Sequence, residues 1–262
     1  MSVAANHRLG FIGTGAITEA IVTGILSGDG PIPEIIVSPR SADTAARLAG
    51  LSSQVTVAAD NQQVADAADT LFLAIRPDVA EEVVRTLHIR PGQRVVSLVA
   101  TIDHATLQSW IATPVNIVRA VPLPFVATRS GVTTIFPPDP AVEALFSTLG
   151  TAVACNTIEE YDLFAAASAL MATYFGLMDH VVGWLQAKGL PQETARAYLA
   201  QHFFSLSAVA IRNPSTSLEN LRHEHSTKGG LNEQVFHEFR DGGGMDALTQ
   251  ALDNVLTRIR AR

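Results

Sequence analysis

Cysteine is almost absent from this chain of 262 residues, because Cys155 is the only one. A single cysteine excludes an internal disulfide and a metal site built from several thiolates. Positive charge is also scarce: 18 lysine and arginine residues face 25 aspartate and glutamate residues, which leaves a net charge of −7. Such a chain would repel nucleic acid and acidic membrane surfaces, so we expect neither as a partner.

Two kinds of hydrophobic segment are missing as well. The chain has no positively charged leader followed by an apolar core, and no uninterrupted apolar run of the roughly 20 residues that span a bilayer. We therefore expect a cytoplasmic protein without a membrane segment. Apolar residues make up 47% of the chain and charged residues only 16%, a composition typical of a well-packed globular protein.

Short apolar runs alternate with helical stretches over the first 157 residues. Strands are predicted at 9–13, 35–37, 55–57, 71–75, 95–99 and 116–119, and 131–136 is expected to add edge segments. Apolar strands separated by helices are typical of a parallel sheet with helices on both faces. Residues 1–157 are therefore predicted to be a doubly wound α/β domain.

The pattern changes after Cys155, where no further strand is predicted. One long helix is expected over about 159–188, followed by helices near 192–212, 217–223, 232–240 and 245–260. The first of these is apolar on all sides, so in so small a domain a partner subunit is expected to cover it. Residues 158–262 are therefore predicted to be an all-α dimerisation domain, in a homodimer or a higher oligomer.

The stretch GFIGTGAITEA, residues 10–20, lies where the first strand meets the first helix. Gly13 permits a tight turn, and Gly15 lets the backbone approach a pyrophosphate that binds the exposed N–H groups of the helix. Thr18 occupies the third position of the motif, where glycine or alanine is usual. At the junction of a strand and a helix, the motif predicts a Rossmann-type dinucleotide site.

The end of the second strand distinguishes the two nicotinamide cofactors. An NAD site usually has an acidic residue there for the ribose 2′-hydroxyl, whereas this chain has Ser38-Pro-Arg40-Ser41. Arg40 offers a planar cation to a 2′-phosphate, so we predict NADP(H). The alternative is that Arg40 is a solvated surface arginine.

Six blocks of the sequence resemble the pyrroline-5-carboxylate reductase family. They are, in order, GFIGTGAITEAIVTGIL, VSPRS, ADTLFLAIRP, VVSLVA, VRAVPLP and HSTKGGLNE. The resemblance covers nearly the whole chain. It implies a Rossmann domain, a helical domain that interlocks two subunits, and hydride transfer from NAD(P)H to a cyclic imine.

The resemblance also implies which residues hold the cofactor. The pyrophosphate would lie on Gly13, Thr14, Gly15, Ala16 and Ile17, and the 2′-phosphate on Ser38, Arg40 and Ser41. Asn61 would lie near the adenosine, and Ala74, Arg76, Pro77 and Ala100 would line the dinucleotide cleft. Arg76 stands where the family usually has lysine, which preserves the charge but not its geometry.

The substrate half departs from the family in three segments. Val121-Pro-Leu-Pro-Phe125 stands for Met-Pro-Asn-Thr-Pro, so Leu123 replaces the asparagine beside the nicotinamide. Ser168-Ala-Leu-Met-Ala-Thr-Tyr174 stands for Ser-Gly-Ser-Gly-Pro-Ala-Tyr. Thr227-Lys-Gly-Gly-Leu-Asn232 stands for Ser-Pro-Gly-Gly-Thr-Thr, the loop that grips the substrate carboxylate in the family. We therefore predict a reductase whose substrate is a related cyclic imine and not pyrroline-5-carboxylate itself.

The expected substrate site combines these segments. Candidate catalytic residues are Tyr174, Ser168 and Asn232, and candidate substrate-binding residues are Pro122, Leu123, Met171, Lys228, Gly229, Gly230 and Leu231. Lys228, the two glycine amides and Asn232 are expected to orient an anionic or amide group. The alternatives are that Tyr174 is a core or interface aromatic and that the glycine loop is only a turn.

Two other functions stay open: dehydrogenation of a small hydroxy or amino acid with NADP, and a non-catalytic dimer that senses NADPH. Residues 160–187 contain no lysine, which counts against the reaction of the β-hydroxyacid dehydrogenases. The histidine pair at 223 and 225 is spaced wrongly for zinc, so no metal is expected.

Overall fold

The computed structural model describes residues 7–99 and 101–261. It divides the chain into two compact units: Met1–Ala165 with Ile259–Arg262, and Ala166–Arg258. The sequence places the boundary after residue 157, at the beginning of α7 (Ile158–Ser168), whereas the structure divides the chain near the end of that helix. Ala100, expected at the cofactor, lies outside the described residues.

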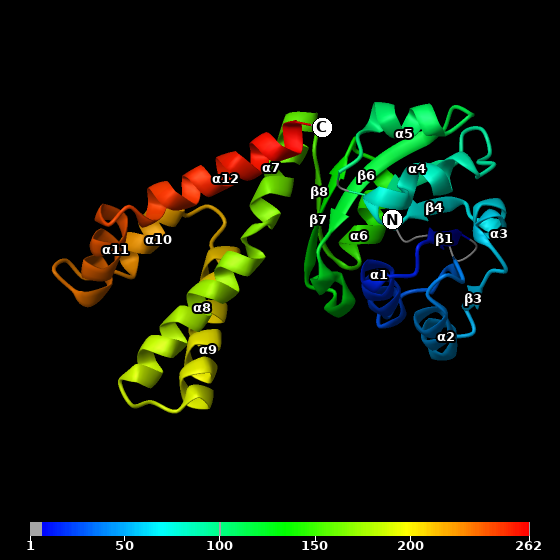
Figure 1. Cartoon of the computed structure of the whole chain (residues 1–262). Helices are drawn as coiled ribbons and strands as arrows, with labels where there is room; N and C mark the ends of the chain where they lie inside the picture. Colours follow the sequence, from blue (N-terminus) through cyan, green and yellow to red (C-terminus); the bar gives the residue numbers. More distant parts are fainter. Residues whose placement is uncertain (1–6, 100, 262) are drawn as a thin grey trace. The chain divides into compact units, whose positions relative to one another are not determined.

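The first unit is built on an eight-stranded sheet in the order β3-β2-β1-β4-β5-β6-β7-β8 (Figure 1). All neighbouring strands are parallel except β6 and β7, which are antiparallel. The strands are β1 (Arg8–Ile12), β2 (Glu34–Val37), β3 (Val55–Val57), β4 (Thr70–Leu73), β5 (Arg94–Ser97), β6 (Asn116–Pro122), β7 (Gly131–Phe136) and β8 (Gly150–Ala154). The doubly wound α/β fold is confirmed. The sequence did not predict β8, whose small residues Gly-Thr-Ala-Val-Ala lack a clear strand pattern.

Helices cover both faces of this sheet because its strands are apolar on both sides. One core contains buried residues of α1 (Ala16–Leu26), α2 (Ala42–Leu51) and α6 (Pro140–Ser147). The other contains buried residues of α3 (Asn61–Ala67), α4 (Pro77–Arg85) and α5 (His104–Trp110). A short 3₁₀ helix, η1 (Pro124–Thr128), follows β6.

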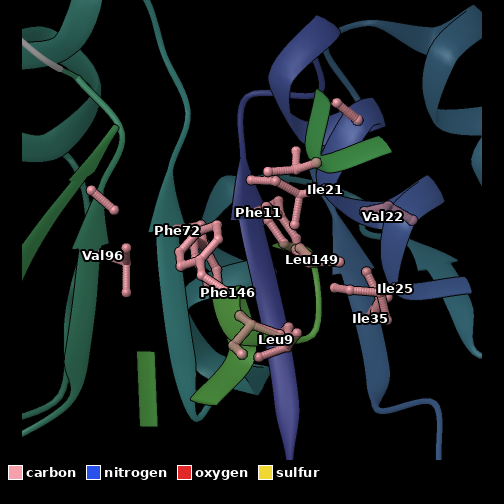
Figure 2. Packing of buried hydrophobic residues seen from close by; sticks show 14 of the residues in the cluster. Leu9, Phe11, Ile21, Val22, Ile25, Ile35, Phe72, Val96, Phe146 and Leu149 are labelled. Carbon is pink, nitrogen blue, oxygen red and sulfur yellow. The ribbon is translucent and has the colours of Figure 1, made fainter. Parts of the chain in front are cut away.

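Strand alternation assigns neighbouring residues to opposite cores. Phe11 belongs to the first core and Ile12 to the second. Phe11 stacks on Phe72 at 4.5 Å between ring centroids, and Phe146 meets Phe72 edge-on at 6.5 Å (Figure 2). These aromatic contacts hold β1 against β4, the strand pair beside which the glycine turn opens.

The second unit is helical. α8 (Leu170–Ala187) and α9 (Gln192–Arg212) form a hairpin around the buried residues Val182, Ala195 and Leu199. The remaining helices are α10 (Leu218–Glu224), α11 (Leu231–Asp241) and α12 (Gly244–Arg260). The single helix expected over 159–188 is wrong, because a turn at Ala169 separates α7 from α8.

Large apolar side chains remain exposed on the hairpin, including Phe175 (59%), Trp184 (57%) and Phe204 (67%). By length and composition alone, one stretch of the described chain, Ile158–Ala187, could cross a membrane. Its most apolar window of 18 residues has a mean hydropathy of 1.2, and only 11% of that window is buried. The sequence predicted no such span because scattered polar residues interrupt its apolar runs. A surface of this kind needs a cover, which the described chain does not supply by itself.

Candidate functional site

The candidate cofactor site lies at the carboxyl ends of β1, β2 and β4. In an open α/β sheet, ligands bind where the strand order reverses, outside these ends. The reversal here lies between β1 and β4, where Ile12 pairs with Leu73 and Gly13 and Ala74 follow the two strands. The structure therefore brings the glycine turn beside Ala74, as the sequence expected.

The two glycines of the turn have different physical roles. Gly13 has a φ of 97°, and a Cβ there would lie 2.2 Å from the carbonyl oxygen of Ala74, so no other residue fits. Gly15 has an ordinary φ of −95°, and a Cβ there would meet no atom within 4 Å. Gly15 therefore leaves open space directly before α1, of the kind that a close backbone approach to a ligand requires.

That open space faces the beginning of α1. Gly15 is the N-cap and provides no side-chain cap, so the first N–H groups of the helix have no intrahelical partner. Ala16 is exposed and Ile17 is half-buried. Free N–H groups and the positive end of the helix dipole together suit a phosphate.

Thr14, Thr18 and Ser38 form a buried set of hydroxyls beneath the turn. The N–H of Gly13 donates to Ser38 Oγ (2.9 Å), and Thr18 Oγ1 donates to the Gly13 carbonyl (2.6 Å). Thr14 Oγ1 donates to the Ser38 carbonyl (2.6 Å) and lies 3.1 Å from Ser38 Oγ. These three residues are at most 1% exposed.

This geometry bears on two expectations. Ser38 was expected on the 2′-phosphate, whereas its hydroxyl is buried and bound to the turn. Thr14 was expected on the pyrophosphate; its side chain points to Ser38 and is buried, so only its backbone is left for such a contact. The sequence also missed the role of Thr18, for which its place in the glycine motif was the available signal.

Arg40 and Ser41 remain exposed where β2 leads into α2. Every other described arginine of the first unit has an ion pair, a hydrogen bond or a ring contact. Arg40 has none. It is thus a cation available to an external anion, adjacent to the dinucleotide turn in the fold.

The remaining cofactor candidates line the same edge of the sheet. Asn61 is the first residue of α3 and is half-buried. Arg76 is the N-cap of α4, and Pro77 is its first residue. The Arg76 guanidinium is paired with Asp78, with Nε 3.1 Å from Oδ1. The charge of Arg76 is therefore partly neutralised.

Pro122 and Leu123, the substrate candidates of the first unit, lie where β6 ends. Pro122 is buried and pairs with Thr133 of β7. Leu123 is half-buried, and its N–H donates to Val132 (3.3 Å). These two apolar residues lie at the end of β6, and neither side chain can donate a hydrogen bond to a substrate.

In the second unit, Ser168 ends α7 and Met171 and Tyr174 lie in the first turns of α8. Tyr174 is 42% exposed, and its ring packs edge-on against Phe175 (5.4 Å) and Phe203 (5.8 Å). Its ring is therefore held while its hydroxyl has no hydrogen bond among the described residues. Met171 is 37% exposed.

The loop before α11 is held by its own hydrogen bonds. Gly229 has a φ of 71°, and its N–H donates to Glu233 Oε2 (2.6 Å). The N–H of Gly230 donates to the Thr227 carbonyl (2.7 Å), and Asn232 Nδ2 donates to the His225 carbonyl (2.7 Å).

Both glycine amides are bonded within the loop, so an anion would have to displace Glu233 and the Thr227 carbonyl to reach them; their expected role as anion donors stays a prediction. Glu233 is the third residue of α11, a position where glutamate commonly caps the helix start. Lys228 and Leu231 are exposed, and Lys228 has no ion pair within the described chain. Lys228 is the one free charge that this loop presents.

No group of three or more histidine, cysteine or acidic side chains is placed to hold a metal ion among the residues described. The titratable groups with shifted pKa values lie elsewhere. Burial raises the pKa of Tyr161 to about 12, and burial also raises the pKa of the Cys155 thiol. Neither is a candidate for proton transfer near neutral pH.

Comparisons with known proteins agree with this geometry. A family model described as NADP oxidoreductase coenzyme F420-dependent matches residues 8–101. One described as pyrroline-5-carboxylate reductase dimerisation matches residues 159–262. The pyrroline-5-carboxylate reductase of Vibrio alginolyticus is 27% identical, over 97% of this chain and 96% of that protein.

Solved structures show the same fold. The 1-pyrroline-5-carboxylate reductase of Streptococcus pyogenes aligns with a TM-score of 0.85 at 20% identity, over 99% of this chain and 100% of that chain. The pyrroline carboxylate reductase of Plasmodium falciparum, solved with NADP bound, gives a TM-score of 0.82 at 16% identity and covers 98% of each chain.

Proposed function

The chain belongs to the pyrroline-5-carboxylate reductase family, and from that premise we propose that it reduces a small cyclic imine with NADPH. It is an NAD(P)-dependent oxidoreductase of this family. The finer proposal is that its physiological substrate is related to pyrroline-5-carboxylate but differs from it. One observation carries this proposal: a dinucleotide turn of the expected geometry combined with a substrate loop whose donors have been changed.

The residues of the first unit fit NADP(H). A Cβ at Gly15 would fill the space through which a pyrophosphate approaches the free N–H groups of α1. Arg40 has no ion pair among the described residues and follows β2, where an NAD site has a carboxylate, and Ser41 is exposed beside it. When bound, the cofactor would supply the hydride, and these residues would fix its position.

The substrate loop supports an altered substrate. The resemblance implies two threonines at the positions of Leu231 and Asn232, and a carboxylate held by the loop. Here the Gly229 amide is bound to the carboxylate of Glu233, which would repel a second carboxylate at the same donor. Lys228 replaces this contact with a mobile point charge. We propose that Lys228 and Asn232 orient an anionic or amide group of a different imine.

Ser168, Met171 and Tyr174 are the proposed substrate contacts on α7 and α8, and Pro122 and Leu123 those at the end of β6. The Tyr174 hydroxyl is the proposed donor to the imine nitrogen, since Phe203 packs against its ring while the residue is 42% exposed. An imine that arrives protonated attracts hydride already, so positioning and exclusion of water would account for most of the catalysis.

A second copy of the chain is the proposed cover of the apolar hairpin. The dimerisation model matches the residues that carry it, and a homodimer would bury side chains such as Trp184 and Phe204 that are exposed in one chain. We propose a cytoplasmic homodimer, in which these helices face a partner subunit and not a lipid bilayer.

The test is NADPH consumption by the purified protein with a panel of five- and six-membered cyclic imines, with and without a carboxylate beside the imine carbon. The proposal expects turnover of at least one imine with a higher kcat/KM than that of pyrroline-5-carboxylate. If pyrroline-5-carboxylate had the highest kcat/KM of the panel, the proposed change of specificity would be rejected. If none of the imines in the panel led to consumption of NADPH, the proposed reductase activity itself would be rejected.

A further inference from the structure

The N–H and the carbonyl of Gly13 are both bonded by side-chain hydroxyls. Its N–H donates to Ser38 Oγ and its carbonyl accepts from Thr18 Oγ1. Ser38 and Thr18 come from different elements, the end of β2 and the first turns of α1. The turn is therefore fastened to α1 by one bond and to the segment after β2 by the other.

Thr14 adds a second connection between the turn and Ser38. Because Thr14 Oγ1 donates its hydrogen to the Ser38 carbonyl at 2.6 Å, Ser38 Oγ can donate its own hydrogen to Thr14 Oγ1 at 3.1 Å. The bonds then run in one direction, from the Gly13 N–H through Ser38 Oγ and Thr14 Oγ1 to the Ser38 carbonyl. In this arrangement the hydroxyls of Ser38 and Thr14 each donate once and accept once, so both are satisfied.

Ser38 is followed by Pro39 and then by Arg40 and Ser41, the residues proposed to bind the 2′-phosphate. Pro39 fixes its own φ and restricts Ser38 to extended conformations. Fixing the Ser38 carbonyl therefore leaves the backbone little freedom before Arg40 and Ser41. Through this carbonyl, the Thr14 hydroxyl connects the pyrophosphate turn to the exposed cation beside β2.

We propose that Thr14 is a positioning residue for cofactor choice: by holding the Ser38 carbonyl it places Arg40 and Ser41 at the distance from the glycine turn that a 2′-phosphorylated dinucleotide requires. The inference rests on the proposed NADPH dependence. Thr14 does not touch the cofactor with its side chain, which is 1% exposed. Its effect on Arg40 passes through Ser38 and Pro39.

Thr18 is the matched control within the chain. Its hydroxyl is equally buried and also bonds the turn, but to the Gly13 carbonyl and without a connection to Ser38. Loss of the Thr18 hydroxyl should disturb the turn for every dinucleotide. Loss of the Thr14 hydroxyl should disturb the 2′-phosphate contacts in particular.

The experiment measures the Kd of NADPH and of NADH for the full-length protein by fluorescence titration, with thermal melting of each variant. Thr14→Val should raise the Kd of NADPH roughly 5- to 10-fold, the factor for about one hydrogen bond, and that of NADH less than about twofold. Thr14→Ser, which keeps the hydroxyl, should keep the wild-type preference for NADPH over NADH. Thr18→Val should raise both Kd values by the same factor.

A double-mutant cycle separates positioning from general loosening. In an Arg40→Ala background, Thr14→Val should no longer affect NADPH more than NADH, because the group that it positions is gone. If Thr14→Val fails to fold, Thr14→Ala provides the same comparison with a smaller side chain. A wild-type protein that binds neither nucleotide, or NADH at least as tightly as NADPH, would overturn the proposed cofactor and this inference with it. A wild type that prefers NADPH, with equal losses of both nucleotides in Thr14→Val or none, would overturn the positioning role alone.

Discussion

Replacing Gly15 by alanine should weaken dinucleotide binding without unfolding the protein. The φ of Gly15 is −95°, which alanine adopts freely, and its Cβ would meet no atom within 4 Å. The free energy of unfolding should therefore change by less than about 1 kcal/mol, the range for a modest change at an N-cap. The new methyl group would instead occupy the space in front of α1.

The loss of binding follows from the bonds that the methyl group displaces. Hydrogen bonds to a charged group contribute about 1.5–3 kcal/mol each. Loss of one bond between a pyrophosphate oxygen and the helix N-terminus should raise the Kd of NADPH by roughly 30-fold. Gly13→Ala should behave differently: its φ of 97° and the contact with the Ala74 carbonyl oxygen at 2.2 Å predict destabilisation of roughly 3 kcal/mol or more.

Urea unfolding and calorimetric titration with NADPH measure both quantities. Gly30→Ala is the matched control, because a Cβ at Gly30 also meets no atom within 4 Å and the residue lies outside the turn. It should change neither stability nor binding. A Gly15→Ala protein that binds NADPH as the wild type does would refute the assignment of the turn to the pyrophosphate.

Three further changes probe other parts of the account. Arg40→Ala should raise the Kd of NADPH about tenfold by removing a charge-assisted contact while that of NADH stays constant; an unchanged Kd of NADPH would show that Arg40 is a solvated surface arginine. Lys228→Ala should raise the KM of the imine and leave the Kd of NADPH unchanged. If neither value changed, the loop would be only a turn between helices. Asp139→Asn should cost about 1–3 kcal/mol of unfolding free energy at pH 7, because the buried carboxylate accepts from the backbone of Val142 (3.0 Å) and from Arg94 Nε (3.0 Å). Burial opposes the charge of Asp139, but these hydrogen bonds outweigh it and lower its pKa. The contribution of the ionised carboxylate to the free energy of unfolding should be complete above about pH 4 and be lost as pH falls through the lowered pKa. The free energies of unfolding of the two proteins, measured with urea, should therefore become equal at low pH.

The dinucleotide-binding half could be predicted from sequence because its signals are local. A strand, a glycine turn and a helix follow one another in GFIGTGAITEA, and the absence of an acid after β2 is visible in VSPRS. The orientation of hydroxyls is not a local property. Ser38 lies 24 residues from Thr14, and only the pairing of β1 with β2 brings the two together, so the sequence assigned Ser38 to the ligand.

The helical half was harder for a different reason. α7 and α8 read as one apolar helix because the turn at Ala169 carries no glycine or proline. In the glycine loop, residue type indicated free amides, but Glu233 and the Thr227 carbonyl take both. Competition between a ligand and the chain's own acceptors depends on side-chain rotamers, which a sequence pattern does not contain.

The most direct measurement follows a labelled hydride. The protein is incubated with NADPH deuterated at the transferred position of the nicotinamide and with the imine panel, and the products are examined by mass spectrometry. The account predicts one deuterium at the former imine carbon of a cyclic amine, formed faster from another imine than from pyrroline-5-carboxylate. Products without deuterium, or the fastest transfer to pyrroline-5-carboxylate, would contradict it.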